Sequence, residues 1–282
     1  MFRRQFTFAA GASLLAAPSL ALTDKVLKFG LTPVFLTNDR ELLQRLEQYL
    51  ATALGGKIEL VFRKTYQEIT SLLIAGELQA AWICGYPYLR NEDRLTILSV
   101  PVWQRQPLYQ AYMIARADRT IDDLEALEGD VHAYSDPDSN SGYLVTQSEL
   151  IKRGHKPASF FEKTFYTFGH RNVVRSVAAG LSHSGSVDGY VWQAMNVAEP
   201  ELTMRTQIVW KSEWMGFPPI ACLTSKKESE AVLAVKSALL SMNETDDGRT
   251  ILGLLQLDRF MVPSPNLFEP IRSRMALLDA EN

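Results

Sequence analysis

The sequence predicts an α/β protein of two lobes, each built on a mixed, mostly parallel sheet flanked by helices, with two hinge crossings between them. Three observations support this fold class. Short apolar strand segments alternate with amphipathic helical segments in two successive series, over 25–84 and 131–192. Such alternation favours parallel strands joined by right-handed crossovers. The stretch from 217 onward is too short for a third domain, so we expect it to return to the first series.

The composition is that of an ordinary globular protein. The chain has 282 residues, of which 46% are hydrophobic and 22% are charged. These values exclude a disordered, collagen-like or coiled-coil protein. The formal net charge of −3 favours neither nucleic acid nor an anionic membrane as a partner. A bound anion must therefore be held by local groups. We expect a monomer without a cofactor or a metal.

Residues 1–21 have the pattern of an export signal. An Arg3-Arg4 pair precedes an apolar run at 6–17, and Ser19-Leu20-Ala21 offers small residues at positions −3 and −1 of a cleavage site. The run is too short to span a bilayer as a helix. The residues around the arginine pair resemble a twin-arginine signal, although the usual Ser or Thr before the pair is missing. We expect a cleaved signal peptide, with the twin-arginine route favoured, and a periplasmic protein.

The first series predicts the core of lobe 1. Its expected elements are a strand at 25–31, a helix at 39–54, a strand at 57–62, a helix at 65–75 and a strand at 80–84. Leucines at helical spacing support the first helix, and Gly55-Gly56 ends it. Ligands of parallel sheets collect beyond the carboxyl ends of the strands, which here means 32–38, 63–66 and 84–88.

The second series predicts lobe 2. Strands at 95–102 and 108–115 lead to strands at 131–134, 165–168 and 186–192, helices at 142–152 and 173–179, extended segments at 202–210 and 217–224, and a helical tail from 226. We assign 22–112 and 217–282 to lobe 1 and 113–216 to lobe 2. The crossings are expected near 110–115 and 214–220, the second being interrupted by Gly216 and Pro218-Pro219.

Polar residues gather at three strand ends of lobe 2. Ser139-Asn140-Ser141-Gly142 stands between a strand and a helix, where free N–H groups and the helix dipole favour an anion. His170 stands at a second such junction, and Asp188 follows a third strand with Tyr190 beyond it. The same residue types also form ordinary caps and turns, and the aromatic rings could equally belong to the core.

The order of these motifs resembles the phosphate/phosphonate-type periplasmic solute-binding proteins of ABC transporters, which have the type 2 periplasmic-binding-protein fold. The resemblance runs from about Phe29 to Thr224. The residues that carry it are Phe29-Gly30-Leu31-Thr32-Pro33, Tyr66, Leu73, Gly76-Glu77-Leu78, Ala81-Trp82, Gly85, Tyr88, Ser139-Asn140-Ser141-Gly142-Tyr143, His170, Val174, Gly180 and Val187-Asp188-Gly189.

This resemblance implies a site for a small oxyanion such as phosphate, phosphite or a phosphonate, delivered to an ABC-transporter permease. Ser139, Asn140, Ser141 and the amide of Gly142 would cradle the anion, and His170 would hydrogen-bond it. Tyr66 and Tyr88 would close over it from lobe 1, and Asp188 would accept from a protonated oxygen or an amine. We also expect aromatic rings along the cleft, with Tyr66, Tyr86 and Tyr88 facing Tyr143, Tyr190 and Trp192.

Cys84 is the main departure from the family pattern, since the strand end it occupies is commonly not a cysteine. Its soft sulfur leaves a second function open, because related binding proteins capture arsenite and signal to a membrane histidine kinase. A third reading is a cysteine-dependent enzyme using Cys84, His170 and Asp188. The sequence has no HExxH, GxSxG or P-loop motif, and its histidines lack metal-ligand spacing. We therefore favour oxyanion binding, followed by thiophilic sensing, and do not expect an enzyme.

Overall fold

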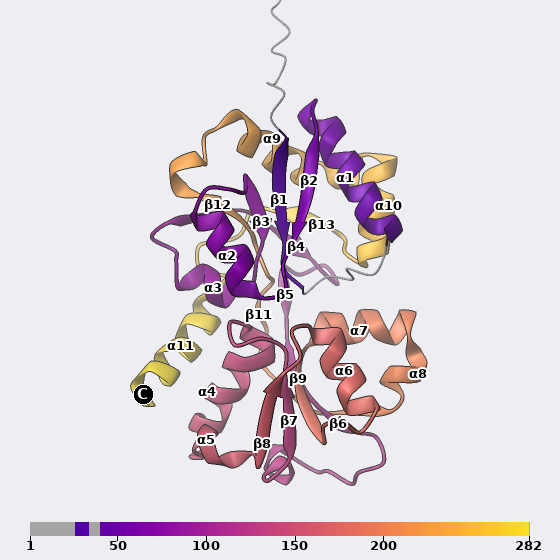
Figure 1. Ribbon diagram of the computed structural model, residues 1–282, viewed down its shortest axis with the longest axis vertical. Helices are drawn as coiled ribbons and strands as arrows, with labels where there is room; N and C mark the ends of the chain where they lie inside the picture. Colours follow the sequence, from indigo (N-terminus) through magenta and orange to yellow (C-terminus); the bar gives the residue numbers. More distant parts are fainter. Residues whose placement is uncertain (1–25, 34–39, 282) are drawn as a thin grey trace, which may run out of the picture.

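The computed structural model describes residues 26–33 and 40–281. The expected export signal at 1–21 and most of the expected 32–38 strand-end segment lie outside these residues. The described chain folds into two lobes stacked along the long axis of the molecule (Figure 1). In the described part of the chain, no helix combines the length and the apolar character needed to cross a membrane.

The sheet of lobe 1 has the strand order β13-β4-β12-β3-β1-β2. Its strands are β1 (Leu27–Leu31), β2 (Ile58–Phe62), β3 (Ala80–Trp82), β4 (Leu95–Val102), β12 (Ile220–Leu223) and β13 (Arg259–Met261). β1 pairs in parallel with β2 and β3, whereas β12 and β13 pair antiparallel to their neighbours. The parallel part is therefore limited to the strands of the first series.

Helices cover both faces of this sheet (Figure 1). α1 (Arg40–Leu54) buries its leucine stripe, and α2 (Tyr66–Ile74) begins with a capping box in which Thr65 and Glu68 satisfy each other's backbone N–H groups. The other helices that follow lobe 1 strands are α3 (Gly85–Leu89), η3 (Thr224–Lys226), α9 (Glu230–Leu240), η4 (Met242–Glu244) and α10 (Asp246–Leu255).

The sheet of lobe 2 has the strand order β10-β6-β9-β7-β8. β7 pairs in parallel with β8 and β9, whereas β6 pairs antiparallel with both β9 and β10. Its strands are β6 (Ala111–Arg116), β7 (Val131–Tyr134), β8 (Lys163–Tyr166), β9 (Ser184–Asp188) and β10 (Thr206–Lys211). Its helices are η1 (Leu124–Leu127), η2 (Asn140–Leu144), α4 (Val145–Lys152), α5 (Pro157–Phe160), α6 (His170–Ala178), α7 (Gly189–Ala198) and α8 (Pro200–Thr203).

The described chain passes between the lobes three times, and two of these passages are short strands that pair with each other. β5 (Leu108–Tyr109) lies antiparallel to β11 (Met215–Gly216), with Tyr109 opposite Met215. The expected strand at 108–115 is thus divided into β5 and β6. The third passage, at 262–268, leads from β13 to the C-terminal helix beside lobe 2. Bending of the small ladder therefore moves one sheet relative to the other only together with this segment.

The segment expected as a strand at 186–192 has a different secondary structure. The expected strand at 186–192 ends at Asp188, because the carboxylate of Asp188 accepts hydrogen bonds from the N–H groups of Tyr190 and Val191 and so begins α7. Tyr190 and Trp192 therefore lie on a helix and do not alternate along a strand. The segment after Cys84 forms the short helix α3.

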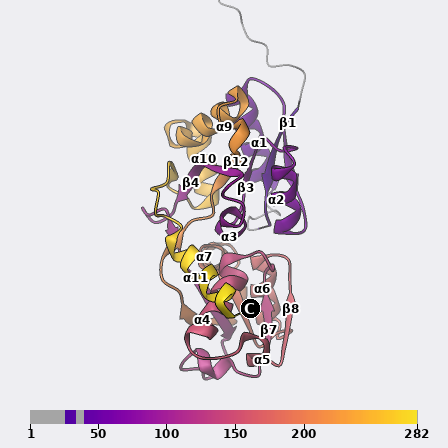
Figure 2. The ribbon, with the colours of Figure 1, turned by 90° about the vertical axis from the view of Figure 1, so that its left-hand side faces the viewer.

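Most of the expected tail packs on lobe 1, and its last helix, α11 (Glu269–Glu281), contacts both lobes: it lies beside α3 of lobe 1, and Arg272 pairs with Glu92 there. α11 runs beside α4 of lobe 2, as Figure 2 shows. Buried Arg274 holds it there by donating to the Val145 carbonyl, the Ser148 hydroxyl and the carboxylates of Glu149 and Glu213. A charged side chain becomes stable in such a buried position only with this many partners.

Candidate functional site

The loop after β7 forms the lobe 2 side of the candidate site. Ser139 accepts a hydrogen bond from the Gly142 N–H at 3.0 Å and thereby begins the η2 turn, which is a π-helix. A Cβ atom on Gly142 would lie 1.8 Å from the Ser135 Oγ atom and 3.0 Å from the ring of His170. Only glycine lets the backbone approach these side chains so closely. The Gly142 amide, expected to bind an anion, is engaged by Ser139 in this structure.

Two polar atoms in this loop are buried without a hydrogen-bond partner among the described residues, the Ser135 Oγ atom and the Asn140 Oδ1 atom. The Asn140 amide nitrogen donates to the Tyr109 hydroxyl at 2.8 Å and contacts the Met215 sulfur at 3.4 Å. Asn140 therefore connects the loop to both hinge strands. Buried polar atoms are nearly always paired, so the unpaired atoms identify this loop as a place for an additional polar group.

His170 is the first residue of α6 and is completely buried. Its Nδ1 atom accepts a hydrogen bond from the Asp188 N–H at 3.0 Å, and burial lowers its pKa to about 3. The ring is therefore neutral near pH 7, and its proton resides on Nε2. Nε2 lies 3.1 Å from the Tyr66 hydroxyl oxygen, to which it donates. The Tyr66 proton is left to point to another acceptor.

Asp136 and Asp188 place carboxyl groups next to these donors. Burial raises the pKa of Asp188 to about 7, although the N–H groups of Val191 and Tyr190 act in the opposite direction. The Asp136 carboxylate accepts from the Tyr66 N–H across the lobes at 3.2 Å, and burial raises its pKa to about 6. Part of the molecules near neutral pH therefore carry a proton on one of these carboxyls.

Cys84 lies at the end of β3 and faces the lobe 2 loop. Its Sγ atom accepts a hydrogen bond from the Asn140 N–H at 3.2 Å, so it joins the two lobes. Burial raises the pKa of the Cys84 thiol to about 12. Cys84 is therefore a neutral thiol here and a poor nucleophile. His170 does not activate it, because the His170 Nε2 atom is turned to Tyr66.

The fold thus brings together most of the expected site residues, namely Tyr66, Cys84, the Ser139–Gly142 loop, His170 and Asp188. Two expected aromatic residues, Tyr88 and Tyr190, contact other parts of the protein. The Tyr88 ring packs on Phe268, with centroids 5.7 Å apart. Tyr190 is buried where the lobes meet, and its hydroxyl donates to the Leu255 carbonyl at 2.6 Å.

The remaining aromatic rings divide between the rim and lobe 2. Tyr86 lies at the interlobe rim, where the Arg90 guanidinium is 5.7 Å from its ring centroid. Tyr143 packs edge-on against Tyr134 within lobe 2, with ring centroids 5.2 Å apart. Trp192 contacts Tyr112 and donates to Thr206, so it packs within lobe 2 away from the loop.

Sequence reasoning missed Ser135, Asp136 and Tyr109 as site residues. Ser135 and Asp136 directly follow the strand β7, so the strand-end rule that selected Ser139 could also have selected them. Tyr109 is on a hinge strand and becomes part of the site only because Asn140 reaches it across the fold.

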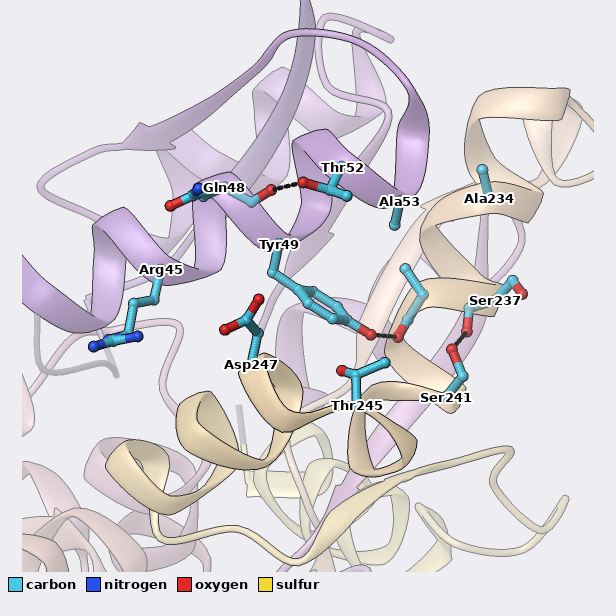
Figure 3. Close-up of a pocket in the computed structure, with 11 residues that line it drawn as sticks. Arg45, Gln48, Tyr49, Thr52, Ala53, Ala234, Ser237, Ser241, Thr245 and Asp247 are labelled. Atoms are coloured by element: carbon cyan, nitrogen blue, oxygen red, sulfur yellow. Dashed lines mark hydrogen bonds between the residues drawn. The ribbon is translucent and has the colours of Figure 1, made fainter.

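A cavity of about 580 Å³ lies within lobe 1, and none of the candidate site residues lines it. Figure 3 shows it between α1, α9 and the start of α10, with Tyr49 reaching across to the Ala238 carbonyl at 2.7 Å. Serine and threonine hydroxyls line much of it. None of the polar side chains that line this cavity is among the buried atoms that lack a hydrogen-bond partner among the described residues. We therefore place the candidate site between the lobes, where Ser135 and Asn140 have such atoms.

Comparison with known proteins is consistent with this geometry. The family model described as ABC transporter, phosphonate, periplasmic substrate-binding protein matches residues 29–267. The Phosphate-import protein PhnD of Mycolicibacterium smegmatis is 26% identical over 175 residues, which is 57% of this chain and 54% of that protein. The chain thus matches about half the length of this curated relative.

Solved structures show the same two-lobed fold. A binding protein component of an ABC phosphonate transporter from Pseudomonas aeruginosa superposes with a TM-score of 0.82 at 19% identity, covering 92% of this chain and 89% of that chain. PhnD1 from Prochlorococcus marinus, in complex with methylphosphonate, gives a TM-score of 0.80 at 15% identity, covering 91% and 99%. At these identities the likeness establishes the fold alone.

Proposed function

This chain belongs to the periplasmic substrate-binding proteins of phosphonate ABC transporters, and from that premise we propose that it captures a small phosphorus oxyanion between its lobes for an ABC permease. Members of this family bind solutes and are not enzymes, and the family is periplasmic. The oxyanion we propose is phosphate, phosphite or a phosphonate. The export signal at 1–21 stays a prediction.

One observation carries this proposal. Donors from both lobes converge on the loop whose Ser135 and Asn140 oxygens are buried without partners among the described residues. The donors are the Tyr66 hydroxyl from lobe 1 and the His170 Nε2–H from lobe 2. A tetrahedral oxyanion inserted there would replace the Tyr66 oxygen as the acceptor of the His170 Nε2–H and would also accept from the Tyr66 hydroxyl. It would accept further from the Ser135 hydroxyl and from the hydroxyls and amides of Ser139, Asn140, Ser141 and Gly142. The Asn140 Oδ1 atom is an acceptor and would take a hydrogen bond from a P–OH group. Preorganised neutral donors can hold an anion without a cationic side chain.

The carboxyl groups of Asp136 and Asp188 favour a protonated ligand. An ionised carboxylate repels a dianion, whereas it accepts a hydrogen bond from a P–OH group. Entry of the ligand requires the lobes to separate at β5 and β11, and closure then surrounds it with groups from both lobes. Tyr88 and Tyr190 have partners outside the loop, so we do not include them in the proposed first contacts.

Thiophilic sensing receives less support from the surroundings of Cys84. β12 and β3 run antiparallel, with Ala221 opposite Ala81. Cys222 therefore lies opposite position 80, four residues along the strand from Cys84. Four residues along a strand correspond to about 13 Å, so these free thiols cannot share one ligand. A single protonated thiol is a weak ligand for a metalloid.

A thermal-shift screen of the purified protein tests the proposal. The probes are phosphate, phosphite, methylphosphonate, sulfate and arsenite. A ligand at a hundredfold excess over its Kd stabilises the native state by about 2.7 kcal/mol. We expect a shift with at least one phosphorus oxyanion. A shift with arsenite alone would replace the proposal by thiophilic sensing, and no shift with any phosphorus oxyanion would refute it.

A further inference from the structure

The cavity of about 580 Å³ in lobe 1 is separate from the candidate site between the lobes. In Figure 3, α1 forms one wall, and α9 with the start of α10 forms the other. The volume falls within the usual range for small-molecule sites, roughly 300–1,000 Å³. On α1 the lining extends from Arg45 to Ala53, which corresponds to about 12 Å of helix. The cavity therefore has room for an elongated small molecule.

The hydroxyl groups that line this cavity already use their protons in hydrogen bonds to the backbone. Tyr49 donates to the Ala238 carbonyl at 2.7 Å. Thr52 and Ser241 each donate at 2.9 Å to the carbonyl four residues earlier in the chain, and Thr245 donates to the carbonyl three residues earlier at 3.5 Å. A hydroxyl has one proton and two acceptor lone pairs. These oxygens can therefore only accept from a ligand, and the cavity favours a ligand that donates hydrogen bonds.

Three of these oxygens lie close together, as Figure 3 shows for Tyr49, Ser241 and Thr245. Burial raises the pKa of Tyr49, the hydroxyls of Ser241 and Thr245 lower it, and the negative charge of Glu244 raises it further. The Tyr49 hydroxyl therefore keeps its proton near pH 7, and that proton is directed to the backbone. A single donor group placed beside Tyr49 can contact several acceptors at once.

The charged groups around the cavity leave an excess of negative charge. The Arg45 guanidinium pairs with the Glu41 carboxylate at 2.8 Å. Asp247 lines the cavity and has no ion-pair partner among the described residues. Glu244 is close enough to act on the pKa of Tyr49. Since the one cation of the lining already has a partner, the remaining carboxylates favour a cationic ligand over an anion.

The start of α10 does not reverse this preference. The N-terminal end of a helix favours an anion through its free N–H groups and a dipole equivalent to about half an elementary charge. Here Thr245 accepts from the Gly248 N–H at 3.1 Å, and Asp246 and Asp247 occupy the first turn. The negative charge of these two carboxylates exceeds the positive end of the dipole.

We propose that this cavity binds a small organic amine, with a primary ammonium group on a short apolar chain. A primary ammonium has three N–H donors, which match the acceptor oxygens around Tyr49 and the Asp247 carboxylate. Figure 3 shows Ala53 and Ala234 at the end of the cavity away from Asp247, where they cover the chain. This site is independent of the proposed function between the lobes.

Calorimetric titrations of the purified protein with six-carbon probes test the site. Hexylammonium, hexanol, hexanoate and 6-aminohexanoate share the chain and differ in charge. We expect hexylammonium to bind at least about fivefold more tightly than hexanol, because a charged donor makes the stronger hydrogen bonds, and hexanoate to bind less tightly than hexanol. Because Arg45 is already paired, 6-aminohexanoate should bind no more tightly than hexylammonium. Saturating methylphosphonate should leave hexylammonium binding unchanged.

Variants locate the bound amine. Asp247→Asn should weaken hexylammonium binding at least about threefold and leave hexanol within about twofold, as expected for an exposed ion pair. Asp246→Asn is the matched control, because it removes the same charge from the same turn, whereas Asp246 pairs with Arg249 and does not line the cavity. It should leave both affinities within about twofold. Ala53→Leu fills the apolar end and should weaken hexylammonium and hexanol alike. Thermal unfolding checks that each variant is folded.

Several results would overturn this assignment. Hexanoate binding as tightly as hexylammonium would exclude the preference for a cation, and tighter binding of 6-aminohexanoate would assign the cavity to an amino acid. Equal losses in Asp247→Asn and Asp246→Asn would exclude contact with Asp247. Displacement of hexylammonium by methylphosphonate would place the amine between the lobes, and an absence of hexylammonium binding would remove the site. Failure of methylphosphonate to bind would refute only the proposed function.

Discussion

The two nitrogens of His170 have separate tasks in this structure, and two substitutions distinguish them. Nδ1 accepts from the Asp188 N–H, and Nε2 donates to the Tyr66 hydroxyl. In His170→Asn the side-chain oxygen can take the position of Nδ1, while the donor toward Tyr66 and the ligand is lost. In His170→Gln the amide can take the position of Nε2, while the acceptor for Asp188 is lost.

The expected magnitudes follow from these contacts. A hydrogen bond to a charged ligand contributes about 1.5–3 kcal/mol, so His170→Asn should raise the Kd for methylphosphonate about 10- to 150-fold. Its stability should change little. His170→Gln leaves the Asp188 N–H buried without an acceptor, which costs the fold about 1–3 kcal/mol, and should keep most of the affinity.

Calorimetry and urea unfolding of both variants decide between these roles. Wild-type affinity in His170→Asn would refute ligand donation by Nε2. A less stable Asn variant combined with weaker binding by the Gln variant would reverse the assigned tautomer.

The low pKa of His170, about 3, adds a pH test. The unfolded state takes up a proton below about pH 6.5 and the folded state does not, so His170 contributes stability that is lost as the pH falls. His170→Asn should show less of this loss.

Three further predictions concern other buried groups. Burial raises the pKa of Asp188 to about 7, so its ionisation should weaken methylphosphonate binding as the pH rises through about 7. The same shift should lower folding stability as the pH rises from about 4 to about 7. Asp188→Asn should flatten both profiles, and parallel profiles for the variant and the wild type would contradict this. Cys84→Ser should retain phosphonate binding and lose about 1–3 kcal/mol of stability, by calorimetry and thermal unfolding, whereas arsenite binding abolished by this change would support sensing. Arg274→Met removes one of the two cations that pair with buried Glu149 and leaves Arg153 at 3.1 Å. In urea unfolding it should destabilise the protein by about 1–3 kcal/mol, whereas Arg272→Met on the exposed side of α11 should cost less than about 1 kcal/mol; equal effects would exclude this role of the ion pair.

Much of the fold could be predicted from the sequence because strands and helices depend on local periodicity. The expected strand at 131–134 and the expected helix at 39–54 agree with β7 and α1 to within one residue. The strand-end rule also selected the Ser139–Gly142 loop and His170, since the carboxyl ends of neighbouring parallel strands meet at one sheet edge. The chain-wide order of motifs was sufficient to indicate the family.

The direction of individual side chains depended on structure that periodicity does not specify. Tyr88 was expected at the site, but the residues after Cys84 form a helix, in which successive side chains point in different directions, and Tyr88 meets Phe268. The tail was expected to pack on lobe 1, and α11 also contacts α4 of lobe 2. A sequence pattern identifies an apolar face and not the neighbour that covers it. The partners of Arg274 in lobe 2 decide the position of α11.

By itself, the sequence determined the alternation of elements, the two-lobed class and the residue types at the strand ends. Only the tertiary structure decided that Tyr66 meets His170 and that Cys84 meets Asn140, because these contacts join segments far apart in the chain across the hinge. It also decided the chemical state of the site. The pKa values of Cys84 and Asp188 rise because both groups are removed from water, and burial is a property of packing that no local pattern contains.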